Sequence, residues 1–339
     1  MLPPSSPEAR PLPVSPATLP IVARFPALAG VPRVAIGRFP TPVEPLAALA
    51  PNLWIKRDDL AADPMGGNKA RALEWLLAGT APGDRVVTVG SAGSTHALAV
   101  ATYASRLGAH ASIGRWRQEM NGAAAEVSHR IAQVAERAPI HRTPVGAYVW
   151  AWAQRGRGAR WIAAGGTTPL GILGHVNGGL ELAEQVARGE LPAPRAAIVP
   201  LGTGGTAAGL SLAFAIAGID TRVVGARVVP KIVGRRRRVV RLANRAAALL
   251  ERLSGTRVPR VSEHSIEVVD HTFGGAYGRE TSAGRDAARR LLAETGIALD
   301  TTYSAKAFAL ALERAALAAP EPVLFWLTFD SRILGERTP

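Results

Sequence analysis

The sequence predicts an α/β fold in which helices cover both faces of parallel sheets. From about residue 53 to residue 327, short apolar segments of strand composition alternate with segments whose apolar residues recur at helical spacing. This alternation is typical of parallel sheets joined by crossover helices. The chain has 339 residues, of which 47% are hydrophobic, and this is enough apolar surface for a large core and for two lobes.

The predicted elements follow one another with short connections. The Pro-rich segment 39–45 is expected to be extended and not helical, because proline restricts both itself and its predecessor. It leads into a strand at 53–56, and the next helix is expected to have Asn68 as its N-cap and to end near Gly79. Further strands are expected at 85–89, 111–113, 139–143, 196–199, 222–229, 265–269 and 322–327, and further helices at 96–107, 123–137, 146–155, 175–188, 206–217, 237–253, 282–294 and 304–318.

The composition excludes several kinds of site. The chain contains no cysteine, which rules out disulfides, a thiolate nucleophile and cysteine-based metal sites, and fits a cytoplasmic location. No apolar run reaches the roughly 18 residues that a membrane span needs. Residues 1–20 are rich in Pro, Ser and Ala and lack the order of a signal peptide, so we expect a flexible tail there.

Arginine supplies almost all of the positive charge. The formal net charge is +14, yet lysine occurs only at positions 56, 69, 231 and 306, so a lysine-dependent chemistry has four candidates. The densest basic cluster, Arg235–Arg238, is explained either as a solvated helix face or as a contact for anions. No aromatic residue is interleaved with this cluster, and we therefore expect no nucleic-acid partner.

Lys69 stands at an unusual place. It follows Gly66, Gly67 and Asn68 at the start of a predicted helix, where its charge opposes the positive end of the helix dipole. The same position lowers the cost of the neutral amine, which a lysine needs in order to form a Schiff base. On these residues alone, a lysine that simply points into water is the more frequent explanation.

A second signal is the loop Gly202-Thr-Gly-Gly-Thr206, which joins the predicted strand 196–199 to a helix. Glycines allow backbone N–H groups to surround a phosphate, the helix end adds positive potential, and Thr203 and Thr206 add hydroxyl donors. The loop matches neither the Walker motif nor the dinucleotide fingerprint. Taken alone, it predicts a phosphate site or merely a tight turn between strand and helix.

Two further motifs carry hydroxyl groups. Within Gly90–Leu98, Ser94 or Thr95 is expected to cap the following helix. Near the C-terminus, Gly275-Ala-Tyr-Gly278 and Leu299–Lys306 contain Tyr277 and Tyr303. A tyrosine with a depressed pKa could serve as acid, base or carboxylate anchor, and the alternative is a pair of core tyrosines.

Lys56-Arg-Asp-Asp-Leu60 followed by Gly66-Gly-Asn-Lys-Ala-Arg-Ala-Leu-Glu74 resembles a family of pyridoxal-phosphate (PLP) enzymes. These are the 1-aminocyclopropane-1-carboxylate deaminases and D-cysteine desulfhydrases of fold type II, the tryptophan-synthase-β-like class. The resemblance extends over about residues 35–328. It implies two α/β lobes with parallel sheets and the cofactor in the cleft between them: a large lobe of residues 21–75 and 177–339, and a small inserted lobe of residues 76–176.

The resemblance also implies roles for individual residues. The lysine that carries the cofactor would be Lys69, and Ser304 would meet the pyridine nitrogen where the cyclopropane deaminases have Glu. Catalytic roles would fall to Lys69, Ser94, Tyr277 and Tyr303, and cofactor binding to Asn68, Lys69, Thr95, Gly202, Thr203, Gly204, Gly205, Thr206, Ser304 and Thr328. The sequence departs from relatives at Gly93, where they have Gln, at Thr95, where they have Asn, and at Phe329 and Asp330, where they have glycines; the loss of Gln at 93 is expected to enlarge the site.

The function that the resemblance implies is a PLP-dependent lyase. It would remove the Cα proton of D-cysteine or a similar small amino acid, eliminate the group at Cβ and give a 2-oxo acid and ammonia, as a homodimer. Ser304 disfavours cyclopropane ring opening, because a neutral hydroxyl leaves the pyridine nitrogen unprotonated and weakens the electron sink. Ring opening, β-replacement, racemisation and a non-catalytic PLP-binding relative stay as alternatives.

Overall fold

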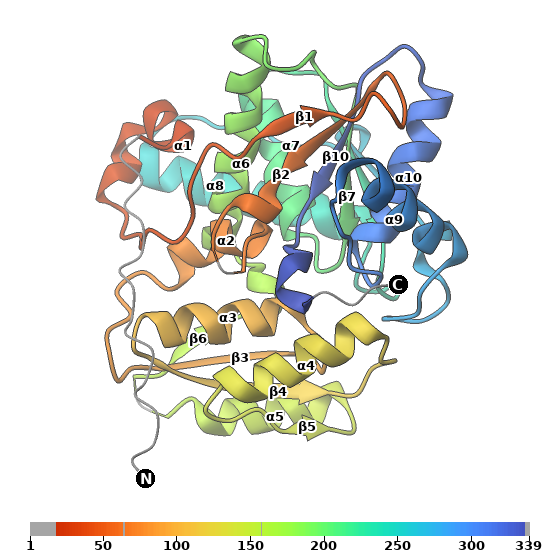
Figure 1. Cartoon of the computed structure of the whole chain (residues 1–339). Coiled ribbons are helices and arrows are strands. Elements are labelled where there is room, and N and C mark those ends of the chain that lie inside the picture. The colour runs from red at the N-terminus through yellow and green to blue at the C-terminus, as the bar shows by residue number, and fades with distance from the viewer. Residues whose placement is uncertain (1–17, 64, 157, 336–339) are drawn as a thin grey trace.

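The computed structural model describes residues 18–63, 65–156 and 158–335. It has two sheets, one above the other in Figure 1, and helices cover both. The larger sheet has the strand order β1 (Val43–Pro45), β2 (Leu53–Arg57), β10 (Val323–Leu327), β7 (Ala196–Leu201), β8 (Arg222–Arg227), β9 (Ile266–Val269). The smaller sheet has the order β5 (Ile140–His141), β4 (His110–Trp116), β3 (Arg85–Ser91), β6 (Arg160–Ile162).

Neighbouring strands are parallel throughout both sheets, except that β1 is antiparallel to β2. The predicted α/β fold with parallel sheets is therefore confirmed. The strands β1 and β6 were not predicted, because three residues next to prolines or in a Trp-containing connection give too short a pattern to detect. In the smaller sheet, α3 (Thr95–Arg106) and α4 (Gly122–Val134) lie on one side and α5 (Pro144–Gln154) on the other (Figure 1).

The remaining helices surround the larger sheet. They are α1 (Pro20–Arg24), α2 (Asn68–Leu76), α6 (Pro169–Ala187), α7 (Gly205–Ala217), α8 (Arg236–Ser254), α9 (Ser282–Thr295) and α10 (Ser304–Leu317). Among the described residues, no helix is long and apolar enough to cross a membrane.

Helix α6 begins six residues before the predicted start, because Thr168 caps it by accepting a hydrogen bond from the Gly171 N–H. Its glycines lie within the helix. They allow close helix contacts: a Cβ at Gly174 would overlap the Arg71 carbonyl of α2, and a Cβ at Gly179 would overlap the side chain of Ala213 in α7. Helix α6 therefore lies tightly between α2 and α7 and sets their relative position.

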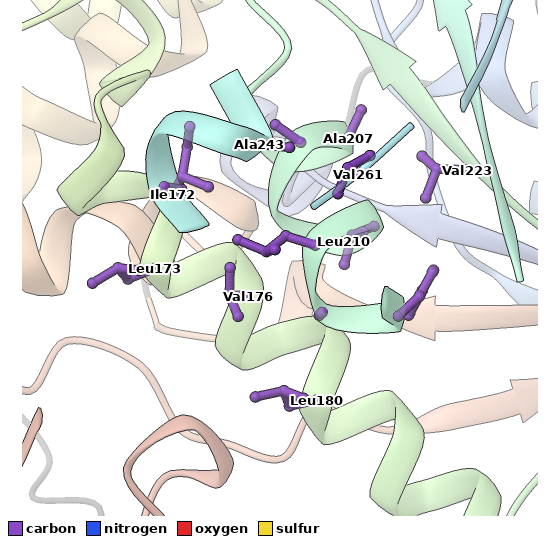
Figure 2. Close-up of a cluster of buried hydrophobic side chains, with 14 of the residues drawn as sticks. Ile172, Leu173, Val176, Leu180, Ala207, Leu210, Val223, Ala243 and Val261 are labelled. Atoms are coloured by element: carbon purple, nitrogen blue, oxygen red, sulfur yellow. The ribbon is translucent and has the colours of Figure 1, made fainter. Parts of the chain in front are cut away.

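The main core is formed where these helices meet the larger sheet. Figure 2 shows Ile172, Leu173, Val176 and Leu180 of α6 beside Leu210 of α7. All of these side chains are buried. Large-to-small changes in such a core cost about 2–5 kcal/mol each. This packing therefore holds α7 in place, and the Gly202–Thr206 loop lies at the start of that helix.

Two predictions of chain organisation need comment. The predicted tail, residues 1–20, lies outside the described residues up to position 17, but its last part was wrong: Leu19 is buried and Pro20 begins α1. The predicted lobe boundary at 176/177 falls inside α6. The four strands of the smaller sheet all lie between residues 85 and 162, and the division of the chain at 76 and 176 stays a prediction.

Candidate active site

A cavity of about 570 Å³ lies between the two lobes. The first turns of α2, α3 and α7 line it, together with residues that follow the carboxyl ends of β3, β4, β7 and β10. The carboxyl ends of parallel strands are where ligands bind in open α/β sheets. Every predicted site residue except Ser304 lines this cavity, and none of its described lining residues is Asp or Glu.

Lys69 is the one lysine at the cavity, and the structure describes all four lysines. Lys56 is fully buried in an ion cluster, the side chain of Lys231 is 78% exposed, and Lys306 donates to the Phe273 carbonyl at 3.0 Å. Burial lowers the pKa of Lys69 from its ordinary 10.5 to about 8. An amine with this pKa is partly neutral near pH 7, as a lysine that attacks an aldehyde or removes a proton must be.

The two glycines before Lys69 are required by close backbone contacts. A Cβ at Gly66 would overlap the Asp59 carbonyl oxygen, and a Cβ at Gly67 would lie 2.5 Å from the Thr328 carbonyl oxygen. Gly67 also has φ +123°, a conformation that other residues rarely adopt. The chain thereby brings the start of α2 against the end of β10.

Asn68 does not cap α2, contrary to the prediction, because it is the first residue of the helix and Gly67 occupies the cap position. Its backbone N–H donates to the Thr328 carbonyl at 3.0 Å. Its side-chain amide donates to the Thr206 hydroxyl at 2.7 Å. Asn68 therefore joins the first turns of α2 and α7, and this contact sets the position of Lys69 relative to the glycine–threonine loop.

A buried ion cluster holds α2 from its other side. Arg71 binds Asp58 at 2.7 Å and Glu181 at 2.9 Å, and Lys56 binds Glu181 at 2.5 Å. Trp326 of β10 donates to Asp58 at 2.7 Å. All four charged side chains are at most 2% exposed, and their charges cancel. Burial alone would raise the pKa of Asp58, but the Arg71 guanidinium outweighs it and lowers that pKa.

The loop Gly202–Thr206 has the geometry of an anion cradle. Gly204 adopts φ +93° and occupies the N-cap position of α7, and the first N–H groups of the helix have no partner within it. A Cβ at Gly205 would lie 3.2 Å from the Thr167 hydroxyl, so a side chain there would enter the space beside the loop. Thr203 shares a 2.6 Å hydrogen bond with Thr167. These groups fit a phosphate at the start of α7.

The motif after β3 places Ser94 at the cavity and at a helix end. Ser94 caps α3 by accepting a 3.3 Å hydrogen bond from the Ala97 N–H, as predicted for Ser94 or Thr95. His96 bonds through Nε2 to the Thr88 hydroxyl at 3.1 Å. Burial, with a smaller contribution from the Lys69 charge, lowers the pKa of His96 to about 3. His96 is therefore neutral and joins α3 to β3 through Thr88.

The expected effect of Gly93 was wrong. Gly93 does not line the cavity. A Cβ there would lie 2.8 Å from the Ala124 carbonyl oxygen of α4, and the Gly93 N–H donates to the side chain of Gln118 at 3.0 Å. Glycine at this position therefore admits α4 and does not enlarge the site; Gln118 lines the cavity instead.

Tyr277 and Tyr303 meet at the cavity wall. Their hydroxyl groups are hydrogen-bonded to each other, their rings lie edge to face with centroids 5.9 Å apart, and the Ser91 hydroxyl donates to Tyr277 at 3.3 Å. Burial raises the pKa of Tyr277 to about 12, so Tyr277 does not have the depressed pKa that would make it a base. Tyr277 is a neutral hydroxyl that can donate a proton or a hydrogen bond.

Three further residues come from the start of α10 and the end of β10: Ser304, Thr328 and Phe329. Ser304 is the first residue of α10 and fully buried. Its backbone N–H donates to the Asp300 carboxylate at 3.0 Å, and its hydroxyl lies beside the same carboxylate. Ser304 itself does not line the cavity, whereas Thr328 and Phe329 do. The expected contact of Ser304 with a pyridine nitrogen stays a prediction.

These groups fit pyridoxal phosphate. The cavity offers one partly neutral lysine amine and an N–H cradle with threonine hydroxyls for a phosphate, where a Cβ at Gly205 would enter the space. The separate roles of these residues stay predictions. Sequence analysis missed the lining residues Trp116, Arg117, Gln118, Tyr148 and Ile232, because they come from segments without a motif. Arg238 also lines the cavity, and it belongs to the arginine cluster for which an anion contact was one of two interpretations.

Comparisons with known proteins agree with this geometry. A family model described as pyridoxal-phosphate dependent enzyme matches residues 34–328. Nocardicin C-9' epimerase of Nocardia uniformis subsp. tsuyamanensis is 34% identical over 330 residues, which cover 91% of this chain and 96% of that protein. D-cysteine desulfhydrase of Salmonella choleraesuis is 30% identical over 294 residues, which cover 82% and 87%.

Solved structures point the same way. The crystal structure of an ACC deaminase homologue has a TM-score of 0.75 and 28% sequence identity, and the match covers 92% of this chain and 95% of that chain. The predicted resemblance and the predicted cofactor are thus confirmed. With a cavity that offers a lysine, an anion cradle and tyrosine hydroxyls, this chain belongs to the pyridoxal-phosphate-dependent enzymes, in the group of the 1-aminocyclopropane-1-carboxylate deaminases and D-cysteine desulfhydrases.

Proposed function

We propose that this protein is a lyase that removes the Cα proton of an amino acid and eliminates the group at Cβ, giving a 2-oxo acid and ammonia. The observation that carries the proposal is Lys69, the one lysine at the cavity, with its pKa lowered to about 8. Bound PLP supplies an electron sink for the charge that develops at Cα. Lys69 then acts as the base, because a pKa of about 8 leaves part of its amine neutral near pH 7.

The other residues bind and orient. The first turn of α7 with Thr203 and Thr206 would hold the phosphate, and the start of α3 with Ser94 would bind the substrate carboxylate. Tyr277 would give a proton to the leaving group, because its raised pKa keeps the hydroxyl protonated. The bonds from Cα to hydrogen and from Cβ to the leaving group break, and water completes the release of ammonia.

Epimerisation at Cα is the second candidate. It is favoured by nocardicin C-9' epimerase, whose match covers 91% of this chain. It begins with the same proton removal by Lys69 and requires a second group to return the proton. The tyrosine pair lines the same cavity and could do this. Elimination is favoured by the D-cysteine desulfhydrase.

The two reactions are separated by one set of measurements. The purified protein, beside Lys69→Ala, is given PLP, and the visible absorption is recorded; we expect a yellow colour that the variant lacks. A panel of D- and L-amino acids is then assayed for 2-oxo acid and ammonia, and for inversion by chiral chromatography in D₂O. A 2-oxo acid with ammonia supports elimination, and inversion with deuterium at Cα supports epimerisation. A protein that stays colourless refutes both. A homodimer and a cytoplasmic location stay predictions.

A further inference from the structure

The cavity continues to a mouth that both lobes build. We call this part the outer pocket and define it by Trp116, Arg117, Tyr148, Ile232 and Arg238. The first three belong to the smaller lobe, at the end of β4 and on α5, and the last two precede and open α8 in the larger lobe. None of them belongs to the predicted cofactor site. A substrate as small as cysteine, held at Lys69, would leave this surface uncontacted.

The outer pocket offers apolar surface to a ligand. The rings of Trp116 and Tyr148 are stacked, with centroids 6.3 Å apart and an angle of 17° between their planes. Tyr148 is 43% exposed and Ile232, on the opposite lobe, is 71% exposed. Large apolar side chains gathered at the mouth of a cavity are typical of a ligand-binding surface. This part of the pocket therefore suits an aromatic or apolar group.

The outer pocket also carries unbalanced positive charge. Arg236 and Arg237 both pair with Glu263, at 2.8 and 3.4 Å, whereas in the described part of the chain Arg117 and Arg238 make no ion pair. Lys69 is the third cation, and none of the described lining residues is a carboxylate. Such a cavity attracts anions. The cofactor phosphate and the substrate carboxylate have expected places at α7 and α3, which leaves these arginines for a further anionic group.

We propose, on the basis of the proposed function, that the substrate is an amino acid with a long side chain that ends in a carboxylate. The apolar middle of that side chain lies against Trp116 and Tyr148, and Arg238 binds the terminal carboxylate. Arg238 is placed for this because it and Tyr148 line the same cavity from opposite lobes. Burial raises the pKa of Tyr148, and the nearby Arg238 charge opposes that rise. Helix α8 of the larger lobe thus binds the far end of the substrate.

One rival role for Arg238 has to be separated. Val239, the next residue, packs against the glycine–threonine loop, with its Cγ2 3.2 Å from the position of a Cβ at Gly204. Arg238 could therefore serve the cofactor phosphate instead of the substrate. The two roles differ in what the change Arg238→Gln weakens: the affinity for PLP, or the affinity for a ligand with a distal carboxylate.

The test is calorimetry on the PLP-loaded protein with two ligands that lack an amine and therefore do not react with the cofactor, 3-phenylpropanoate and 3-(4-carboxyphenyl)propanoate. We expect the dicarboxylate to bind about tenfold more tightly, as a charge-assisted hydrogen bond gives. Arg238→Gln should abolish this difference and leave the Kd of 3-phenylpropanoate and of PLP unchanged. The control Arg235→Gln removes an exposed charge from the same turn, outside the cavity, and should keep the difference.

Equal binding of the two ligands to the unchanged protein would overturn the proposal. A weaker PLP affinity in Arg238→Gln, with the preference for the dicarboxylate retained, would overturn it as well and assign Arg238 to the phosphate. The proposed function fails separately: a protein without cofactor colour refutes the lyase and with it this substrate. A yellow enzyme that turns over small amino acids and shows no preference for the dicarboxylate refutes only the outer pocket.

Discussion

At the inner end of the cavity, backbone segments approach one another too closely for a Cβ, whereas at the mouth exposed side chains from distant segments define the surface. Gly66 and Gly67 lie against Asp59 and Thr328 carbonyls, and the buried ion cluster around Arg71 holds the same helix from behind. Tyr148 and Ile232, by contrast, are 43% and 71% exposed. The inner end therefore tolerates few substitutions. Side chains of the outer pocket can be substituted with little effect on the stability of the fold.

This difference separates two properties of the enzyme. The inner end determines where the reactive amine lies and hence the class of reaction, because Lys69 moves if either glycine or the ion cluster moves. On the proposal above, the outer pocket selects the side chain that the substrate can carry. Two relatives that differ in activity, an epimerase and a desulfhydrase, are compatible with an inner end held in common and mouths that differ.

The largest effect is expected for Lys69→Ala. Loss of a general base lowers kcat by roughly 10²–10⁴-fold, and the protein should lose the colour of the lysine-bound cofactor as well. The measurement is steady-state kinetics with visible absorption. Lys231→Ala is the control, because the side chain of Lys231 is 78% exposed and does not line the cavity. Equal activity of the two variants would contradict the assignment of Lys69.

Arg71→Met should destabilise the protein strongly, since it leaves Asp58 and Glu181 buried with too few partners. Breaking a buried ion pair by removing one member costs about 3–5 kcal/mol in the free energy of unfolding. Urea unfolding at fixed PLP concentration measures this. The control is Arg289→Met, which breaks an exposed pair with Asp286 and should cost at most about 1 kcal/mol. Similar costs for both variants would show that the cluster does not hold α2.

Gly67→Ala should cost more than Gly189→Ala. Both glycines have positive φ, at +123° and +76°. An alanine at either position therefore strains the backbone and lowers the free energy of unfolding by roughly 1–2 kcal/mol. Only at Gly67 does the new Cβ meet a carbonyl, 2.5 Å away, whereas Gly189 has no atom within 4 Å. Urea unfolding and PLP affinity measure both effects. If PLP affinity stays normal in Gly67→Ala, the close contact does not position Lys69.

The pH dependence of cofactor capture reports the environment of Lys69. The neutral amine is the form that attacks the aldehyde of PLP, and burial lowers the pKa of Lys69 to about 8. The rate constant for PLP capture by cofactor-free protein should rise about tenfold per pH unit below pH 8 and level off above it. Stopped-flow absorption measures the rate. A rate that keeps rising tenfold per pH unit up to pH 10 would show that burial does not lower the pKa of this amine.

Much of the inner end could be predicted from the sequence because its parts are contiguous. Gly66–Lys69 and Gly202–Thr206 are each a run of neighbours along the chain, and each requires particular residue types for steric reasons. The errors have physical causes as well. Helix α6 begins six residues before its predicted start, because Gly174 and Gly179 allow it to pack closely against α2 and α7. Asn68 suggested a helix cap and instead joins two helices through its side chain.

The α/β fold class could be read from the sequence alone, and Lys69 and the Gly202–Thr206 loop stood out there as candidates, since backbone geometry imposes local patterns along the chain. Only the tertiary structure decided that Gly93 admits α4, that Tyr277 has a raised pKa, and that Arg238 shares a cavity with Tyr148. These properties depend on which distant segments meet and on how much water they exclude. Burial and electrostatic interaction are set by neighbours in space, which no run of adjacent residues specifies.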